Sequence, residues 1–110
     1  MPKDDLVRLR HMLEAAREAI AFIEGQSRSD LAADRKLALA LARCIEIVGE
    51  AAANVSLEGQ ARIPGIPWRS IVGMRNRVVH AYFDVDLDRL WDTVTDDLPP
   101  LVAELERILA

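Results

Sequence analysis

The chain has 110 residues, of which 51% are hydrophobic and only 5% aromatic, and its formal net charge is −4. This length suits one domain over residues 1–110, and the abundance of Leu, Ala, Ile and Val favours a helical bundle over a sheet. The acidic balance excludes a broadly basic nucleic-acid coat, the lone Cys44 excludes an internal disulfide, and no apolar run is long enough to cross a bilayer.

The chain begins with a helical pattern in which apolar residues recur at steps of three and four. This spacing predicts an amphipathic helix over residues 4–24 that ends near Gly25. Residues 27–30 are expected to form a turn in which Ser29 or Asp30 caps the next helix. A turn this short lets the second helix run back along the first.

The second helical pattern, from Leu37 to Val55, is apolar nearly all the way round. A helix of this kind in a small domain needs cover on two sides, so we expect a homodimer in which a second copy packs on it. Its polar stripe holds Arg43, Glu46 and Glu50, and the first two are expected to form an ordinary surface pair. Glu50 either joins that solvated stripe or holds Arg75 in place, and the sequence leaves both possibilities open.

The next part of the chain is expected to hold one long loop and a third helix. The loop spans residues 56–66, where glycine and proline interrupt the helical pattern. Pro67 can open the next helix, because the first helical turn tolerates a missing N–H group. The third helix is therefore predicted over residues 67–81.

The last helix begins after Asp84 or Asp86, either of which can cap it. Its apolar pattern keeps the same phase across Pro99 and Pro100, which predicts one helix kinked at the prolines rather than two helices. The Asp residues between positions 84 and 97 are expected to serve as caps and as a solvated acidic face. Four helices with mostly short links predict an all-α, antiparallel four-helix bundle with a proline-kinked last helix.

A gap in the acidic residues marks the candidate site. From Gly59 to Phe83 the chain carries no Asp or Glu, but it holds Arg62, Arg69, Arg75 and Arg77. This window therefore carries +4 in a chain whose net charge is −4. An acidic protein with a basic window around its most polar segment is expected to bind an anionic ligand there.

Within this window, residues 74–82 bring together a guanidinium, an amide, an imidazole and a phenol. RNA carries its own nucleophile, the ribose 2′-OH, so its cleavage needs a proton acceptor and a cation beside the phosphate. The imidazole of His80 suits the first role, and the guanidinium of Arg75 suits the second. Asn76 can orient His80 or bind a phosphate oxygen. The alternative is a histidine at a helix end beside a solvated arginine.

The run from Ile66 to Asp86 resembles the signature of HepT-like proteins in the HEPN superfamily. Segments 34–38 and 47–52 resemble the second helix of that family, and segments 90–92 and 97–99 resemble its last helix. The resemblance covers essentially the whole chain. It implies a four-helix bundle that forms a homodimer.

The resemblance also implies a function. Many proteins of this family are ribonucleases that need no metal ion, and they act as toxins paired with a MntA-type minimal nucleotidyltransferase as antitoxin. The family motif Arg-x-x-x-x-His-x-Tyr corresponds to Arg75, His80 and Tyr82 of this chain. In the family, the antitoxin disarms the toxin by transferring AMP to the motif tyrosine, which is Tyr82 here.

Residues and resemblance together predict the toxin of a type VII-like toxin–antitoxin pair, an endoribonuclease that uses no metal and no cofactor. The expected catalytic residues are Arg75 and His80, the expected AMP acceptor is Tyr82, and the expected supporting or RNA-binding residues are Asn76, Arg77, Arg69 and Glu50. The expected partners are an mRNA or tRNA substrate, a second copy of the chain and the antitoxin, with no DNA and no membrane. The charged N-terminus has no signal-peptide core, so we expect a cytoplasmic protein. The alternative is a non-catalytic helical subunit that docks a nucleotidyltransferase.

Overall fold

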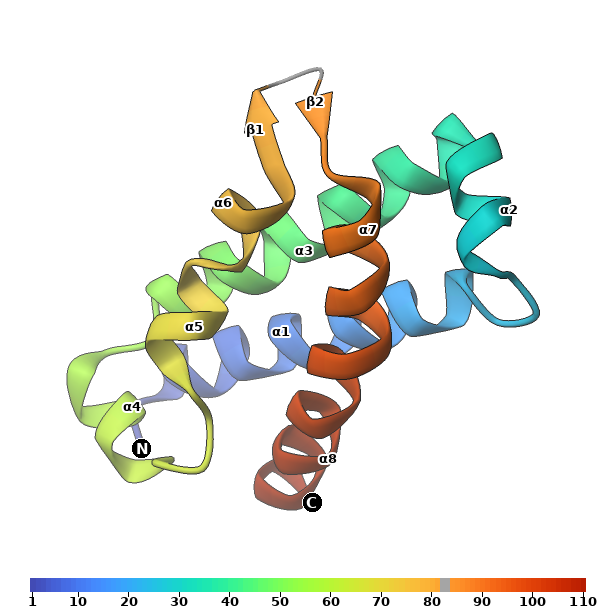
Figure 1. Cartoon of the computed structure of the whole chain (residues 1–110). Helices are drawn as coiled ribbons and strands as arrows, with labels where there is room; N and C mark the ends of the chain where they lie inside the picture. Colours follow the sequence, from blue (N-terminus) through green and yellow to red (C-terminus); the bar gives the residue numbers. More distant parts are fainter. Residues whose placement is uncertain (82–83) are drawn as a thin grey trace.

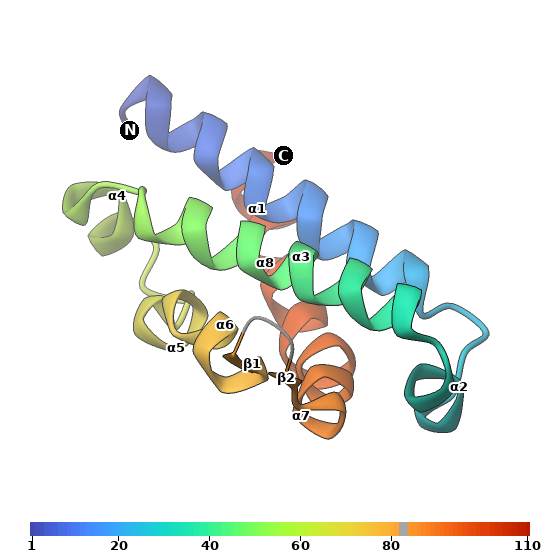
Figure 2. The ribbon, with the colours of Figure 1, turned by 90° about the horizontal axis from the view of Figure 1, so that it is seen from above.

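The computed structural model describes residues 1–81 and 84–110, and two long helices form its framework. Helix α1 (Lys3–Phe22) and helix α3 (Arg35–Ala53) lie side by side in antiparallel directions (Figure 1). Seen from above, most of the remaining chain packs on one face of this pair (Figure 2). The fold therefore has two layers with the core between them.

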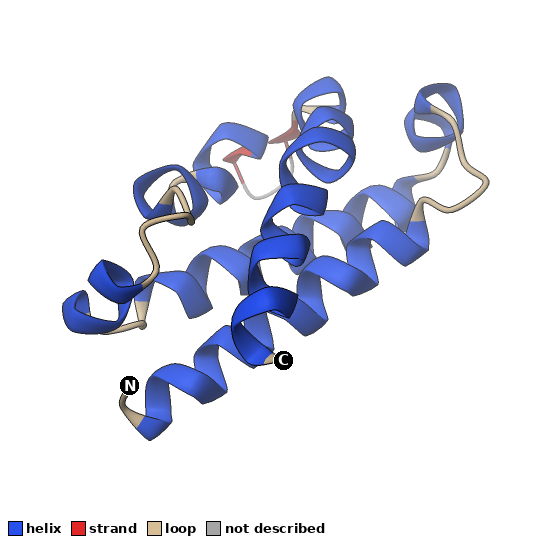
Figure 3. Ribbon diagram, turned by 90° about the horizontal axis from the view of Figure 1, so that it is seen from below, coloured by secondary structure: helices blue, strands red, loops and turns tan. Residues whose placement is uncertain are grey.

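The shorter elements are α2 (Arg28–Ala33), α4 (Leu57–Arg62), α5 (Trp68–Val72), α6 (Met74–Val78), and the strands β1 (Val79–Ala81) and β2 (Asp84–Val85). The C-terminal helical run consists of α7 (Leu87–Asp92), the π-helical turn η1 (Thr93–Asp97) and α8 (Leu98–Leu109). Figure 3 shows helices throughout, with a short hairpin between α6 and α7. The predicted all-α class is confirmed.

The core draws its side chains from both layers. Its largest fully buried side chains include Leu9, Met12, Leu31, Leu41, Ile45, Met74, Leu90, Leu98 and Leu105. Helix α3 is covered by α1 on one side and by α5 and α6 on another, all within one chain. The apolar surface of α3 therefore does not by itself require a second copy, and the homodimer stays a prediction.

The two long helices follow the sequence pattern closely. Helix α1 ends at Phe22, and Gly25 then adopts the left-handed backbone with φ of 76°, which glycine adopts without strain. The predicted turn over residues 27–30 is wrong, because these residues begin helix α2. Ser27 and Asp30 form its capping box, in which each side chain accepts a hydrogen bond from the other residue's backbone N–H.

Side-chain caps also correct two other expectations. Helix α3 is capped by Asp34, which accepts the backbone N–H of Leu37 at 3.1 Å, and not by Ser29 or Asp30. The predicted loop over residues 56–66 contains helix α4. Ser56 caps α4 by accepting the N–H of Gly59 at 3.0 Å, so a good cap outweighs a sequence that favours a loop.

The predicted helix over residues 67–81 is the largest departure from expectation. It is broken at Gly73 into α5 and α6, and it continues as strand β1 from Val79. Glycine lowers helix stability, and two adjacent β-branched valines, Val78 and Val79, favour extended backbone. The carbonyl of Val78 accepts the N–H of Asp86 at 2.7 Å and so ties the chain into the hairpin.

The last helix is confirmed as one helical run that continues across the prolines. Asp86 caps it by accepting the N–H of Arg89 at 3.0 Å, which settles the choice between Asp84 and Asp86. The irregularity lies just before Pro99, where the N–H of Leu98 donates to the carbonyl of Thr93, five residues back. A π-helical turn thus accommodates the prolines.

A buried carboxylate joins the N-terminal helix to the α3–α4 junction. Asp5 is only 3% exposed, and it accepts hydrogen bonds from the hydroxyl and the backbone N–H of Ser56. These two hydrogen bonds, the hydroxyl's first, lower the pKa of Asp5. Gly59 leaves room for this contact, because a Cβ at that position would lie 2.4 Å from a carboxylate oxygen of Asp5.

Within residues 1–81 and 84–110, we find no helix that is both long enough and apolar enough to span a membrane.

Candidate active site

His80 lies in a β-bulge. Strands β1 and β2 are antiparallel, with Val79 opposite Val85 and Ala81 opposite Asp84. One residue more therefore separates the paired positions on β1 than on β2, and that extra residue is His80. Such bulges redirect a side chain and are common beside active sites. The direction of the imidazole is thus set by an irregular hairpin and not by a helix.

The bulge brings His80 next to a carboxylate. The Nδ1 atom of His80 lies 3.9 Å from Oδ2 of Asp84, across the hairpin. The two side chains are 55% and 61% exposed, so a ligand can reach both from solvent. A carboxylate at this position can orient the ring.

Arg75 and Asn76 precede the hairpin on α6, and both are exposed. A helix over residues 67–81 would have put Asn76 and His80 on one face, one turn apart, but the helix ends at Val78. The N–H of Val79 donates to the carbonyl of Arg75, which closes the last turn of α6. Arg75 and His80 therefore belong to two consecutive elements that meet at Val79.

Arg77 is already engaged within the chain. Its guanidinium donates to the carbonyl of Ser70 at 3.1 Å and so ties α6 back to α5 across Gly73. Arg69 is exposed on α5. Arg69 and Arg77 share an open hollow of about 600 Å³, whose other lining residues are Pro67, Trp68 and Ser70. This hollow extends the basic surface beyond His80.

Glu50 does not brace Arg75. Among the described residues no ion pair joins the two, and Glu50 lines a pocket between α1 and α3 together with Arg8 and His11. The neighbouring Gly49 is the residue that faces α5, since a Cβ there would lie 3.4 Å from the carbonyl of Val72. One step along a helix turns the side chain by about 100°, so Glu50 faces α1 instead.

Other predictions have mixed outcomes. The surface pair of Arg43 and Glu46 is confirmed. Tyr82, the predicted AMP acceptor, lies outside the described residues, so its role stays a prediction.

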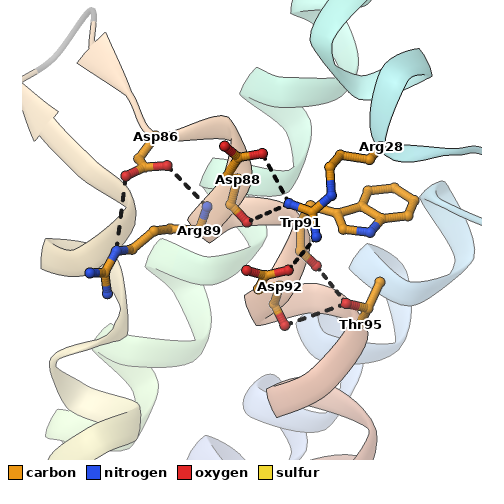
Figure 4. Close-up of polar contacts among 7 residues, drawn as sticks. All are labelled: Arg28, Asp86, Asp88, Arg89, Trp91, Asp92 and Thr95. Carbon is orange, nitrogen blue, oxygen red and sulfur yellow. Dashed lines mark hydrogen bonds and ion pairs between the residues drawn. The ribbon is translucent and has the colours of Figure 1, made fainter.

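Two of the aspartates expected on a solvated face form a clamp with α2. The guanidinium of Arg28 lies 3.0 Å from a carboxylate oxygen of Asp88 and 2.6 Å from one of Asp92 (Figure 4). Arg28 thereby joins the start of α2 to α7, next to the hairpin. These hydrogen bonds, that with Asp92 first, raise the pKa of Arg28. We call this group of three residues the Arg28 clamp.

Asp84 is the site residue that sequence reasoning missed, because it was interpreted as a cap or as a solvated acid. A signal for it was present. The run from Val78 to Phe83 is rich in β-branched and aromatic residues, which is typical of a strand. A strand that starts near Val79 and pairs with the residues after Phe83 would have placed His80 and Asp84 across a hairpin.

Comparisons with known proteins agree on one family. A family model described as ribonuclease HepT-like matches residues 12–108. The chain is 40% identical over 100 residues to a protein named probable ribonuclease HepT from Thermococcus cleftensis, and the match spans 87% of this chain and 91% of that protein. It is 34% identical over 101 residues to a candidate RNase from Caldanaerobacter subterraneus subsp. tengcongensis, spanning 92% and 90% of the two chains. A candidate RNase from Methanocaldococcus jannaschii is 32% identical over 98 residues, spanning 89% and 90%. No solved structure matches the chain.

Proposed function

The chain belongs to the HepT-like ribonuclease family, and we propose that it is an endoribonuclease that acts as the toxin of a toxin–antitoxin pair. The observation that carries the proposal is the position of His80, which sits in an exposed bulge beside Asp84. The residues before this pair in the sequence form the basic window, in which the only charged side chains, apart from His80 itself, are arginines. An imidazole and a guanidinium that solvent can reach are the groups that RNA cleavage through its own 2′-OH needs.

His80 starts the reaction as a general base. It takes the proton of the ribose 2′-OH while that oxygen attacks the phosphorus atom. The bond from phosphorus to the 5′-oxygen breaks, and the 5′-oxygen leaves with a proton. The products are a 2′,3′-cyclic phosphate and a 5′-OH. A second histidine, His80 of another copy across a dimer axis, can supply the proton for the leaving oxygen.

Arg75 stabilises the charge that develops on the phosphate oxygens during attack. A guanidinium stays protonated and can present two parallel N–H donors to a phosphate. Asn76, the next residue on α6, and Arg69 on α5 are also exposed and extend the contact along the RNA backbone. Arg77 contributes to RNA binding less directly, because its guanidinium donates a hydrogen bond to Ser70 and so links α6 to α5.

Asp84 acts through His80 as a positioning residue. Its carboxylate lies on the Nδ1 side of the ring, so the Nε2 atom is left for the substrate. The carboxylate holds the ring in one orientation while Nε2 accepts the proton. This arrangement needs no metal ion for proton transfer or for charge stabilisation.

Control by an antitoxin fits the same hairpin. Tyr82 lies in the sequence between His80 and Asp84, which face each other. AMP attached to its phenol by a partner nucleotidyltransferase would add a bulky anion beside the catalytic pair. The RNA phosphate would then be excluded both by volume and by charge.

The test is RNA cleavage by the purified protein in EDTA, with total RNA and tRNA as substrates. Wild-type protein should release fragments ending in a 2′,3′-cyclic phosphate, and His80→Ala should lower the rate by about 10²-fold or more. His11→Ala is the matched control, because His11 is exposed on α1 away from the hairpin, and it should leave cleavage unchanged. Undiminished cleavage by His80→Ala, or cleavage that appears only after a metal ion is added, would contradict the mechanism.

A further inference from the structure

A small pocket adjoins the catalytic hairpin. It has a volume of about 260 Å³ and lies between α2, the start of α3 and β2. Its lining includes Leu31 and Ala32 of α2, Arg35 and Leu39 of α3, and Asp84 and Val85 of β2. We call it the α2–hairpin pocket.

The pocket is continuous with the catalytic pair through Asp84. The Oδ2 atom of Asp84 faces His80 at 3.9 Å, and the same residue lines the pocket. A carboxylate has a second oxygen, which remains available to a ligand. A group bound in the pocket is therefore separated from His80, the proposed general base, only by the side chain of Asp84.

Most of the residues that line the pocket are aliphatic, and the surface that they leave exposed is about evenly divided between polar and apolar atoms. Leu31 is 1% exposed and forms part of the core, whereas Leu39 is 47% exposed on the rim. An exposed leucine next to a pocket gives an apolar surface on which a flat ring can lie. Polar atoms then enter at the edge, from Asp84 and from Arg35. A flat heterocycle with polar edges fits this combination.

Arg35 places a positive charge at the N-terminus of helix α3. It is the first residue of α3, whose first turn contains no acidic residue, and the N-terminus of a helix is already positive. No hydrogen bond or ion pair to its guanidinium occurs within residues 1–81 and 84–110. The exposed guanidinium of Arg35, next to the capping residue Asp34, is therefore a group that can bind an anion at this pocket.

The Arg28 clamp holds the α2 wall in place. Arg28 reaches Asp88 and Asp92 of α7 from the first turn of α2 (Figure 4). This contact joins the two elements that flank the pocket, α2 on one side and the segment after β2 on the other. The clamp therefore connects the two walls of the pocket.

We propose that the α2–hairpin pocket binds the nucleobase next to the phosphate that is cleaved, and so gives the enzyme its base preference. The inference rests on the proposed ribonuclease function and names the part of the RNA that this surface recognises. The aliphatic walls hold the faces of the base, and Arg35 binds a backbone phosphate. The free oxygen of Asp84 accepts an N–H from the exocyclic amino group of the base. This chemistry favours adenine, cytosine or guanine, which carry an exocyclic amino group, over uracil.

The test uses short RNAs that differ only in the bases flanking the cut, each made non-cleavable by a 2′-deoxy sugar at the attacking position. Binding is measured by fluorescence anisotropy. At one flanking position, amino-bearing bases should bind wild-type protein about tenfold more tightly than uracil. Ala32→Phe fills the pocket from an exposed position, and it should abolish this preference. Ala103→Phe, an equal change at an exposed position of α8, should keep it.

Leu39→Ala provides a second route if the larger side chain disturbs folding, because Leu39 is half-exposed and its loss opens the pocket wall. It should weaken the preference while circular dichroism stays that of wild type. The proposal is overturned if wild-type protein shows no base preference at either flanking position, or if Ala32→Phe keeps it. It is also overturned if Ala32→Phe changes the oligomeric state in light scattering, since the pocket would then receive a second copy.

These outcomes separate the pocket from the proposed function. Cleavable versions of the same RNAs report whether the chain is a ribonuclease at all. RNA that is cut by wild-type protein and not by His80→Ala, but with one rate for every flanking base, would leave the function standing and refute the pocket. Absence of cleavage would refute the function, and the binding series would still decide whether the pocket reads a base.

Discussion

The α1–α3 pair differs from the site segment, by which we mean residues 68–81 together with residues 84 and 85, in how its structure is stabilised. The pair consists of long regular helices whose inner faces are fully buried, as at Leu9 and Leu41. The segment consists of short elements secured by single contacts, such as the hydrogen bond from Arg77 to Ser70. Arg69, Arg75 and Asn76 are exposed in this segment, and His80 is 55% exposed. The comparison teaches that a regular framework supplies the stability and leaves an irregular segment free to carry the site.

The largest expected effect tests the framework. Leu41→Ala should lower the free energy of unfolding by about 2–5 kcal/mol, because it removes a completely buried side chain and leaves a cavity. Leu39→Ala, two residues earlier on the same helix but 47% exposed, should change it by less than about 1 kcal/mol. Chemical denaturation followed by circular dichroism measures both. Equal losses would mean that α3 is not buried on the side described.

The next effect tests the site segment. Asp84→Asn should lower the rate of RNA cleavage about tenfold, through loss of the charge beside His80, while the melting temperature changes little because Asp84 is exposed. Asp84→Glu should recover part of the rate, since it restores a carboxylate. A fall in melting temperature as large as that of a core substitution would instead show that Asp84 holds the hairpin together.

The stability of the framework should depend on pH through the carboxyl group of Asp5. The hydrogen bonds from Ser56 lower the pKa of this carboxyl below its ordinary value of 3.8, so the folded state favours the ionised form. The resulting stabilisation is complete above the unfolded-state pKa and is lost as pH falls through the lower folded-state pKa. Melting curves of wild type and Asp5→Asn should therefore differ at neutral pH and converge in acid. A difference that persists unchanged at low pH would remove Asp5 as the cause.

The smallest effect concerns the Arg28 clamp. Its side chains are 49%, 80% and 55% exposed, so water and salt screen the ion pairs. Arg28→Ala should lower the melting temperature only slightly, and the loss should shrink further in high salt. Arg10→Ala, on the exposed surface of α1, serves as the control and should have no comparable salt dependence. A loss that is insensitive to salt would show that the clamp acts by packing and not by charge.

Much of the framework is predictable because its helices are periodic. The apolar step along α1, α3 and the last helical run fixes which faces are buried, and Asp86 marks where that last run begins. The site segment is less predictable, because its sequence carries two opposing signals. The apolar pattern favours one helix over residues 67–81, whereas Gly73 and the valines at positions 78 and 79 disfavour it. Its residue types still predict the chemistry of Arg75 and His80, since an imidazole and a guanidinium have few alternative uses in a basic window.

The sequence by itself determined the helical class, the family, and which side chains could handle a proton and a phosphate. Only the tertiary structure decided where those side chains lie. The bulge at His80 depends on its pairing with a strand that follows the turn, and Glu50 faces α1 because of how α3 is rotated against its neighbours. Periodicity is a local property that a sequence carries in full, whereas strand register and helix rotation are decided by contacts between residues far apart in the chain.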